Sequence, residues 1–358
     1  MKIAIYGAGA IGGYLGCELV RAGADVTMIA RDRTLAAIRE RGVTLHIKGE
    51  TKVGRPAATD DPAEAGSQDA VIVAVKAHAA PAIARSITPL LGPDTIVVSA
   101  VNGIPWWYFH DHGGDLAGTR LETVDPGNVQ WDAIGPERAI GCVVYPAAEA
   151  IAPAVIQHHS SNRFSIGEPS GERSERVMRL ADTLKAAGFS APVRPNIRNE
   201  IWLKLWGNLS FNPVSAITGA TLEQMAHDPL IRPVIAEMMA EARVVAEKLG
   251  VSFGIGIDKR IDGAGKVGAH RTAMLQDLDA GRSMEIDALV SVVQEVGSLT
   301  GIPTPTIDGV AALVKQLARV NGLYPQEMAC PTRSPLSSGR SLKRLGAGPA
   351  SLLSGTIA

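Results

Sequence analysis

Three polar residues at intervals of four, Lys204, Asn208 and Asn212, form the first group in the sequence that could carry out chemistry. Apolar residues around them recur at spacings of three and four, which predicts an amphipathic helix beginning near Arg198 with the polar side chains on one stripe. A partly buried lysine has a lowered pKa and can donate a proton near neutral pH. Two amides on the same face can hold carbonyl or carboxylate oxygens. Such a stripe suits the reduction of a ketone, whose oxygen needs a proton once a hydride has reached the carbon.

The same segment has a plainer interpretation. Glu200 stands four residues before Lys204, and an exposed ion pair at this spacing stabilises a helix by roughly 0.2–0.5 kcal/mol. Spacing alone favours this ion pair. Pro213 also makes a helical backbone at Asn212 less favourable, because a proline restricts the residue before it. Both alternatives remain open at this point.

Glu285 is a second candidate for catalysis. It falls in the predicted first turn of a later helix, over 286–299, for which Ser283 is the expected N-cap. A carboxylate there benefits from the helix dipole and needs no further role. On the inward stripe of that helix, however, Glu285 can pair with Lys204 or accept a hydrogen bond from a product hydroxyl.

A dinucleotide site is predicted at the start of the chain, in six consecutive residues: Gly7, Ala8, Gly9, Ala10, Ile11 and Gly12. They follow a predicted strand and open a predicted helix, which is the context that the G-x-G-x-x-G pattern requires. Gly7 permits a tight turn, Gly9 lets the backbone approach a pyrophosphate, and Gly12 allows close packing of helix and strand. Free N–H groups at the helix start face the phosphate charge. A glycine-rich turn without a ligand is the alternative.

The residue after the second predicted strand indicates which cofactor binds. Arg31 follows that strand, where a carboxylate would hold the ribose 2′-hydroxyl of NADH, and its guanidinium suits the 2′-phosphate of NADPH. Asp32 could still reach a ribose, and Arg31 could be a solvated surface cation. Lys76, after the third strand, either adds charge near that phosphate or lies in water. Asn102, after the fourth, can hydrogen-bond the nicotinamide amide or the substrate.

The elements that must position these residues divide the chain in two. Short apolar strands at 3–6, 26–30, 70–75 and 96–100 alternate with helical stretches, a pattern that predicts a parallel sheet with helices on both faces. Segments 140–145 and 155–166 are expected to add antiparallel strands at one edge. From residue 196 the spacing becomes helical, over 202–209, 234–249, 264–278 and 286–299. The predicted fold class is α/β, with an N-terminal Rossmann-type doubly wound sheet followed by an all-helical C-terminal domain.

Three segments follow from this division. Residues 1–195 are the predicted NADP-binding domain, and residues 196–325 are the predicted helical domain for substrate and catalysis. Residues 326–358, rich in Ser, Gly, Pro and basic residues, are expected to be a disordered tail. Four consecutive aromatic residues, at 106–109, lie in the first domain. They can wall the pocket for nicotinamide and substrate, or they can belong to the core or to a subunit interface.

The composition points to small-molecule partners. The 358-residue chain has a formal net charge of -1, so no basic field is present to hold nucleic acid. Glycines or charges such as Lys76 interrupt the apolar runs, so no membrane segment and no secretory leader are expected. Three widely spaced cysteines, Cys17, Cys142 and Cys330, fit neither a disulfide framework nor a zinc site, and no metal site is predicted. These features favour a cytoplasmic protein.

Several short motifs together resemble those of one known family. They are Gly7-Ala8-Gly9-Ala10-Ile11-Gly12, Val75-Lys76-Ala77, Asn102-Gly103, Asn196-Ile197-Arg198 with Glu200 and Trp202, Lys204-Leu205 with Asn208, Asn212-Pro213, Met274-Leu275-Gln276-Asp277 and Glu285-Ile286-Asp287. With them, the chain resembles the ketopantoate reductases from residue 1 to about residue 324. The resemblance implies an NADP-dependent oxidoreductase acting on CH-OH donors, which reduces 2-dehydropantoate to pantoate in pantothenate and coenzyme A biosynthesis.

The resemblance also implies roles for the candidate residues. Lys204 would be the general acid, and Glu285 would be the carboxylate that interacts with it and with the substrate hydroxyl. This reverses the preference for a surface ion pair at Lys204. The remaining roles are binding roles, with nicotinamide or substrate positioned by Asn102, Asn208 and Asn212 and the NADP phosphate contacted by Arg31 and Lys76. The assembly is left open, with a homodimer as one alternative.

One residue departs from the family pattern. Ala273 stands directly before Met274, where the family's ketopantoate-binding enzymes usually carry a serine. Thr272 can replace that hydroxyl only if the local backbone differs, because adjacent helical positions point about 100° apart. The departure favours reduction of another branched or aryl 2-oxo acid as the main alternative. A non-catalytic NADP-binding sensor is a further alternative, although a sensor has no use for a proton donor.

Overall fold

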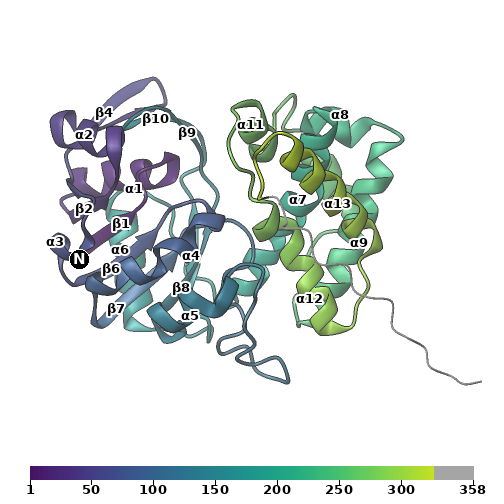
Figure 1. Cartoon of the computed structure of the whole chain (residues 1–358), viewed down its shortest axis with the longest axis horizontal. Coiled ribbons are helices and arrows are strands. Elements are labelled where there is room, and N and C mark those ends of the chain that lie inside the picture. The colour runs from purple at the N-terminus through teal and green to yellow at the C-terminus, as the bar shows by residue number, and fades with distance from the viewer. Residues whose placement is uncertain (326–358) are drawn as a thin grey trace, which may run out of the picture. The chain divides into compact units, whose positions relative to one another are not determined.

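The N-terminal part of the chain is built on a seven-stranded sheet (Figure 1). Its strands, in spatial order, are β11 (Phe164–Gly167), β8 (Ala139–Val144), β7 (Leu91–Ser99), β6 (Gln68–Val73), β1 (Lys2–Tyr6), β2 (Asp25–Ile29) and β5 (Ala57–Thr59). All neighbours are parallel except β11, which runs antiparallel to β8. Because β1 lies between β2 and β6, its carboxyl end is the switch point at which such sheets bind ligands. The structure, a computed structural model, describes residues 1–325, so the predicted tail at 326–358 lies outside the described residues.

Helices cover both faces of this sheet. One face packs against α1 (Ala10–Arg21), α2 (Asp32–Arg41) and α6 (Glu175–Ala186). The other packs against α3 (Pro62–Ala65), α4 (Ala80–Ile83), α5 (Val129–Ile134) and the short η2 (Ala84–Leu90). Side chains alternate along β1, so that Ile3 and Ile5 enter one core and Ala4 the other. Three further single turns, η1 (Ala77–Ala79), η3 (Pro126–Asn128) and η4 (Pro136–Arg138), lie in the connections.

A second sheet of four strands was not predicted. Its order is β4 (Glu50–Gly54), β3 (Val43–Ile47), β10 (Val155–Ser160) and β9 (Ala147–Ala152). The prediction that 140–145 and 155–166 add antiparallel strands at one edge of the main sheet is therefore wrong in part. Strand β8 runs parallel to β7, residues 155–160 belong to this second sheet, and only β11 joins the main sheet as an antiparallel edge strand. Helix α1 packs against both sheets, which explains why nearly all of its residues from Gly12 to Leu19 are buried.

The C-terminal part is helical, as Figure 1 shows in green and yellow. Its elements are α7 (Ile197–Thr218), α8 (Leu222–His227), α9 (Ile231–Lys248), α10 (Ile257–Gly265), α11 (Ala273–Asp279), η5 (Asp287–Ser291), α12 (Val292–Thr300) and α13 (Pro305–Val320). Helix α7 lies at the centre, because it packs against α8, α9, α11, α13 and η5 and also against β8 and β11 of the main sheet. The asparagine Asn196 caps its start by accepting a hydrogen bond from Asn199 N. A parallel sheet with helices on both faces, followed by this helical part, confirms the predicted fold class.

Helix α7 continues through Pro213, so Asn212 is helical and lies on the predicted helix with Lys204 and Asn208. Two other local predictions in the helical part were wrong. The predicted helix over 264–278 is two helices, α10 and α11, and Thr272 caps the second by accepting a hydrogen bond from Leu275 N. Helical structure after residue 283 begins at Ile286, so Glu285 precedes the first turn and Ser283 is not its cap. Tertiary packing decides these ends, which local propensity leaves open.

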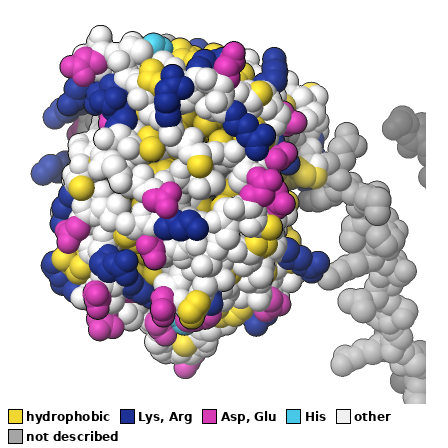
Figure 2. All heavy atoms as spheres, turned by 90° about the vertical axis from the view of Figure 1, so that its left-hand side faces the viewer, with side chains coloured by type: hydrophobic (Ala, Val, Ile, Leu, Met, Phe, Trp, Pro, Cys, Tyr) yellow, Lys and Arg dark blue, Asp and Glu magenta, His cyan; other side chains and the backbone are white. Residues whose placement is uncertain are grey.

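The boundary predicted between residues 195 and 196 stays a prediction, because Met1–Tyr324 form one compact unit. Within the described residues, no helix has the length and apolarity needed to cross a membrane. Figure 2 shows one face of the molecule, on which Lys and Arg side chains are interspersed with Asp and Glu. The basic side chains on this face are therefore not gathered into a single stripe.

Candidate active site

The glycine motif forms a tight turn from the carboxyl end of β1 into α1. Gly7 has a φ of +105°, which side chains rarely tolerate, and a Cβ built on Gly12 would lie 1.9 Å from Gly7 O. A Cβ on Gly9, by contrast, would meet nothing within 4 Å. Gly9 is the N-cap of α1, and no side chain caps that helix, so its first N–H groups stay available to a phosphate. The turn, which also includes Ala8, Ala10 and Ile11, therefore has the shape and donors that a dinucleotide pyrophosphate needs.

Arg31 lies beside this turn. It follows β2 as the N-cap of α2, and Gly7 N donates a hydrogen bond to Ile29 O at 3.1 Å, which holds the two strand ends together. The Arg31 side chain is exposed, and its guanidinium has no ion pair or hydrogen bond among residues 1–325. Asp32 has a φ of 51°, in the left-handed region. The structure thus leaves a free cation next to the pyrophosphate turn.

Lys204, Asn102 and Glu285 are brought together from α7, the loop after β7 and the segment before η5. Lys204 Nζ donates to Asn102 Oδ1 at 2.6 Å and to the carbonyl oxygen of Val144 at the end of β8. Asn102 Nδ2 donates to Glu285 Oε2 at 3.3 Å. Ala77 N donates to the other carboxylate oxygen of Glu285 at 2.8 Å. The amide of Asn102 therefore links the lysine and the carboxylate, which do not pair directly.

Burial tunes the lysine toward proton transfer. It lowers the pKa of Lys204 to about 8, and the negative charge of Glu285 limits that fall. A side-chain amine with a pKa near 8 is largely protonated at neutral pH and can still release its proton easily. The Lys204 side chain is partly exposed and lines a small cavity together with Asn102, Cys142 and Asn208. The amine therefore faces this cavity and is not fully enclosed by the core.

The surface ion pair between Glu200 and Lys204, which spacing alone favoured, does not form among the described residues. Glu200 instead pairs with Arg163, and it accepts hydrogen bonds from Ser165 Oγ at 2.8 Å and Tyr145 Oη at 3.1 Å. The Tyr145 ring in turn lies 5.9 Å from Lys204 Nζ. Tyr145 was missed from the sequence, although it follows a buried strand in the same way as Asn102 does.

The other two amides of the α7 stripe lie on the same helix without partners. Asn208 is partly buried and Asn212 is 7% exposed. Neither side-chain amide has a hydrogen bond within residues 1–325. Asn208 lines the cavity of Lys204, whereas Asn212 is not among its lining residues. Their binding roles stay a prediction.

Lys76 faces the helical part of the chain. Its Nζ lies 2.5 Å from Asp277 Oδ2 and 4.0 Å from Glu285 Oε2, and Arg282 Nε donates to the other Asp277 oxygen at 3.0 Å. Asp277 was not predicted as a partner, although it stands in the Met274–Asp277 motif. A contact between Lys76 and an NADP phosphate stays a prediction, which requires the lysine to exchange its present partners.

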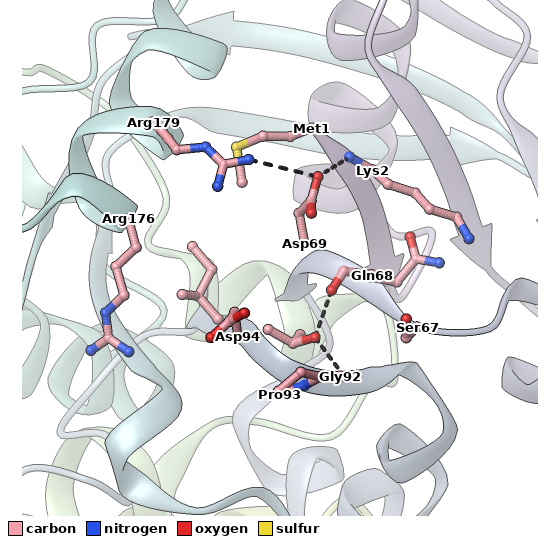
Figure 3. A pocket seen from close by; sticks show the side chains of 12 residues that line it. Met1, Lys2, Ser67, Gln68, Asp69, Gly92, Pro93, Asp94, Arg176 and Arg179 are labelled. Atoms are coloured by element: carbon pink, nitrogen blue, oxygen red, sulfur yellow. Dashed lines mark hydrogen bonds and ion pairs between the residues drawn. The ribbon is translucent and has the colours of Figure 1, made fainter.

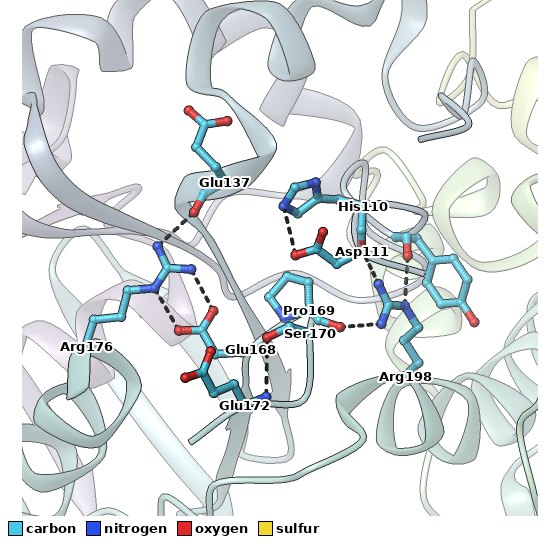
Figure 4. Close-up of polar contacts among 10 residues, drawn as sticks. His110, Asp111, Glu137, Glu168, Pro169, Ser170, Glu172, Arg176 and Arg198 are labelled. Carbon is cyan, nitrogen blue, oxygen red and sulfur yellow. Dashed lines mark hydrogen bonds and ion pairs between the residues drawn. The ribbon is translucent and has the colours of Figure 1, made fainter. Parts of the chain in front are cut away.

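The aromatic run at 106–109 belongs to the core, since its four side chains are at most 4% exposed. The backbone around it is held by Arg198 of α7, which donates to the carbonyl oxygens of Tyr108 at 2.9 Å, Pro169 at 2.5 Å and His110 (Figure 4). This run is therefore a support for the loop that follows Asn102 rather than a pocket wall.

A second hollow lies at the opposite edge of the sheet, by the amino ends of β1, β6 and β7 (Figure 3). Asp69 there accepts a hydrogen bond from Lys2 N at 2.8 Å and pairs with Arg179 at 4.0 Å. Its neighbour Arg176 is held by both oxygens of Glu168. These charged groups satisfy one another. Among residues 1–325 no group of three or more His, Cys, Asp or Glu side chains is placed to hold a metal ion.

The fold and the site together define a class. A glycine turn at the switch point of a parallel sheet, with a partly buried lysine and amides at the same edge, is the arrangement of an oxidoreductase that uses a nicotinamide dinucleotide.

Comparison with known proteins identifies the family. The family model described as "Ketopantoate reductase PanE/ApbA" matches residues 3–171, and the one described as "Ketopantoate reductase PanE/ApbA C terminal" matches residues 196–318. The 2-dehydropantoate 2-reductase of Mesorhizobium japonicum is 55% identical over 325 residues, covering 90% of this chain and 100% of the relative. The chain belongs to the ketopantoate reductase family.

Solved structures agree with this assignment. A protein from Ralstonia solanacearum is 42% identical with a TM-score of 0.87, and the match covers 90% of this chain and 99% of that one. A PanE/ApbA family ketopantoate reductase from Ralstonia eutropha is 27% identical with a TM-score of 0.77, covering 90% and 100% of the two chains.

Proposed function

We propose that this protein reduces 2-dehydropantoate to pantoate with NADPH, in pantothenate and coenzyme A biosynthesis. The observation that carries the proposal is the hydrogen-bonded series Lys204, Asn102 and Glu285, which adjoins the edge of the sheet that holds the glycine turn. The family membership and the 55% identity to a 2-dehydropantoate 2-reductase support the substrate. We place the enzyme in the cytoplasm, and we keep a homodimer as the expected assembly.

The residues of the chain bind the substrate and donate the proton that the ketone oxygen needs. Reduced nicotinamide, when bound, supplies a hydride to the ketone carbon. Lys204 directs its ammonium group at the ketone oxygen and gives up a proton as that oxygen becomes a hydroxyl, so the lysine ends the step as a neutral amine that solvent reprotonates. Asn102 holds the amine in place through its carbonyl oxygen. Glu285 is in reach to accept a hydrogen bond from the product hydroxyl and favours the charged form of Lys204.

The preference for NADPH rests on Arg31. Its exposed guanidinium lacks a partner among the described residues and lies beside the pyrophosphate turn, where a 2′-phosphate can accept its hydrogen bonds. Lys76 is the second cation proposed for that phosphate, and its ion pair with Asp277 competes with this role.

A kinetic assay tests the proposal. We expect purified protein to consume NADPH in the presence of 2-dehydropantoate, and Arg31→Ala to raise the KM for NADPH by about tenfold while changing that for NADH little, because one charged hydrogen bond is worth about 1.5 kcal/mol or more. Arg33→Ala, which removes an exposed arginine two residues away, is the matched control. Turnover of another 2-oxo acid but not of 2-dehydropantoate would show that 2-dehydropantoate is not the substrate. It would favour the alternative that Ala273 suggests, a reductase of another branched or aryl 2-oxo acid. Tight NADPH binding without any turnover would favour the sensor.

A further inference from the structure

Arg260, on α10, carries a guanidinium that has no partner within residues 1–325. Its Nε is buried without a hydrogen bond, and its side chain forms no ion pair. The two acidic residues nearest to it on α10 are engaged elsewhere, since Asp258 and Asp262 pair with Arg232 at 3.0 and 2.8 Å. Burial lowers the pKa of Arg260, yet an arginine remains charged at neutral pH. Because an unpaired charge that is partly buried is costly, this position calls for an anion that is not among residues 1–325.

The guanidinium lies against the helix that carries the proton donor. A Cβ built on Gly207 of α7 would lie 2.6 Å from Nη2 of Arg260 and 3.3 Å from its Cζ. Residues three and four apart are neighbours on a helix, so Lys204, Gly207 and Asn208 share one face of α7. The absence of a side chain at Gly207 is therefore what lets the guanidinium approach this face, about one helical turn (~5 Å along the axis) from Lys204.

The same face of α7 borders the cavity, because Lys204 and Asn208 line it. The two cations beside this face differ in their partners. Lys204 donates to Asn102 Oδ1 and to the carbonyl oxygen of Val144, whereas Arg260 has no hydrogen-bond acceptor within residues 1–325.

We propose that Arg260 binds the carboxylate of the 2-oxo acid substrate. The inference rests on the proposed function and deepens it. In a 2-oxo acid the carboxylate is bonded directly to the ketone carbon, so a ligand whose ketone oxygen faces Lys204 must have an anion site close by. A planar guanidinium with free N–H groups matches a carboxylate in two-point geometry. Arg260 then selects 2-oxo acids over neutral ketones, and Gly207 makes room for it.

Substitution of the arginine tests this role. We expect Arg260→Ala to raise the KM for 2-dehydropantoate, and the Kd of pantoate for the NADP⁺-loaded protein, by about 10- to 100-fold. The KM for ketopantoyl lactone, which has no free carboxylate, should change little. Added methylguanidinium should restore part of the loss with 2-dehydropantoate. Lys259→Ala, which removes the exposed neighbouring cation on the same helix, is the matched control and should leave every constant unchanged.

Substitution of the glycine tests the geometry. Gly207→Ala should displace the guanidinium and raise the same KM and Kd in the same direction as Arg260→Ala does. Gly263→Ala is its control, because a Cβ at Gly263 of α10 meets nothing within 4 Å. Melting temperatures of all variants show whether they are folded.

The outcomes separate the two proposals. Equal pantoate Kd values for the unmodified protein and Arg260→Ala would overturn the role of Arg260, even if 2-dehydropantoate is turned over. Equal losses with 2-dehydropantoate and the lactone would overturn it too, because a carboxylate contact cannot affect the lactone. Failure of the unmodified protein to reduce 2-dehydropantoate would overturn the proposed function, while a pantoate Kd that depends on Arg260 would still support the anion site.

Discussion

Helix α7 presents two regions where partly buried cations meet it, and these regions differ in how their charges are satisfied. In its first turn, Arg198 donates to three backbone carbonyl oxygens that come from two separate loops. One to three turns later, Lys204 has two acceptors, while Arg260, which lies against Gly207, has none within residues 1–325. Burial lowers the pKa of all three groups.

This difference distinguishes a cation that stabilises the fold from a cation that binds a ligand. Burial and a lowered pKa are common to both regions, so neither property distinguishes them. What differs is hydrogen bonding: each guanidinium nitrogen of Arg198 donates to a carbonyl oxygen, whereas Arg260 and the amides of Asn208 and Asn212 have no hydrogen bond within residues 1–325. We infer that the first region stabilises the chain and that the second binds a ligand, and each prediction below tests that contrast.

The largest effect is expected for Lys204→Ala. Loss of a general acid should lower kcat by about 10²- to 10⁴-fold, because the developing alkoxide then has no positioned proton donor. Steady-state kinetics with NADPH and 2-dehydropantoate would measure this. Lys248→Ala, at an exposed position in α9, is the matched control and should retain full activity. A kcat within tenfold of that of the unmodified protein would remove Lys204 from the role of acid.

Arg198→Ala should act on stability instead. It leaves three carbonyl oxygens without their charged donor, which we expect to lower the free energy of unfolding by about 3 kcal/mol. Denaturant unfolding would measure this fall in the free energy of unfolding, with Arg173→Ala, a substitution of an exposed arginine, as the control. The kcat of the folded fraction should stay within a few fold of that of the unmodified protein. A large fall in kcat without a change in stability would contradict the contrast between the two regions of α7.

The smallest effect is a pH dependence of the reduction. The reaction needs protonated Lys204, whose pKa is lowered to about 8, so kcat/KM should be flat below that pH and fall about tenfold per pH unit above it. For the oxidation of pantoate, kcat/KM should instead rise with pH up to the pKa of Lys204, because this direction needs the neutral amine. Glu285→Gln should shift the fall in kcat/KM of the reduction to lower pH, since the Glu285 charge raises the pKa of Lys204. An unshifted pH profile in Glu285→Gln would exclude this coupling.

Patterns that repeat along the chain could be predicted from the sequence. Apolar strands alternating with helices predicted the parallel sheet, and the G-x-G-x-x-G turn fell at the carboxyl end of β1, because both depend on neighbours in sequence. Lys204, Asn208 and Asn212 were predicted on one helix, and the structure places them there. The second sheet was missed, because β3 and β10 pair across more than one hundred residues.

The identity of each contact partner was decided only by the tertiary structure. Glu200 and Lys204 had the spacing of an ion pair, but they bind other partners. Glu200 pairs with Arg163, which lies directly before β11, and Lys204 donates to Asn102 in the loop after β7, and periodicity cannot locate either partner. Arg260 gave no signal at all, since nothing in its neighbourhood in sequence shows that Asp258 and Asp262 are taken by Arg232.

The sequence by itself determined the order of the elements, the dinucleotide turn and the stripe that carries the lysine, because these follow from local periodicity and from residues close together in the chain. Only the tertiary structure decided which charges are satisfied and which are left open for a ligand. Hydrogen-bond satisfaction is a property of groups that meet in space, so it cannot be read from spacing along the chain.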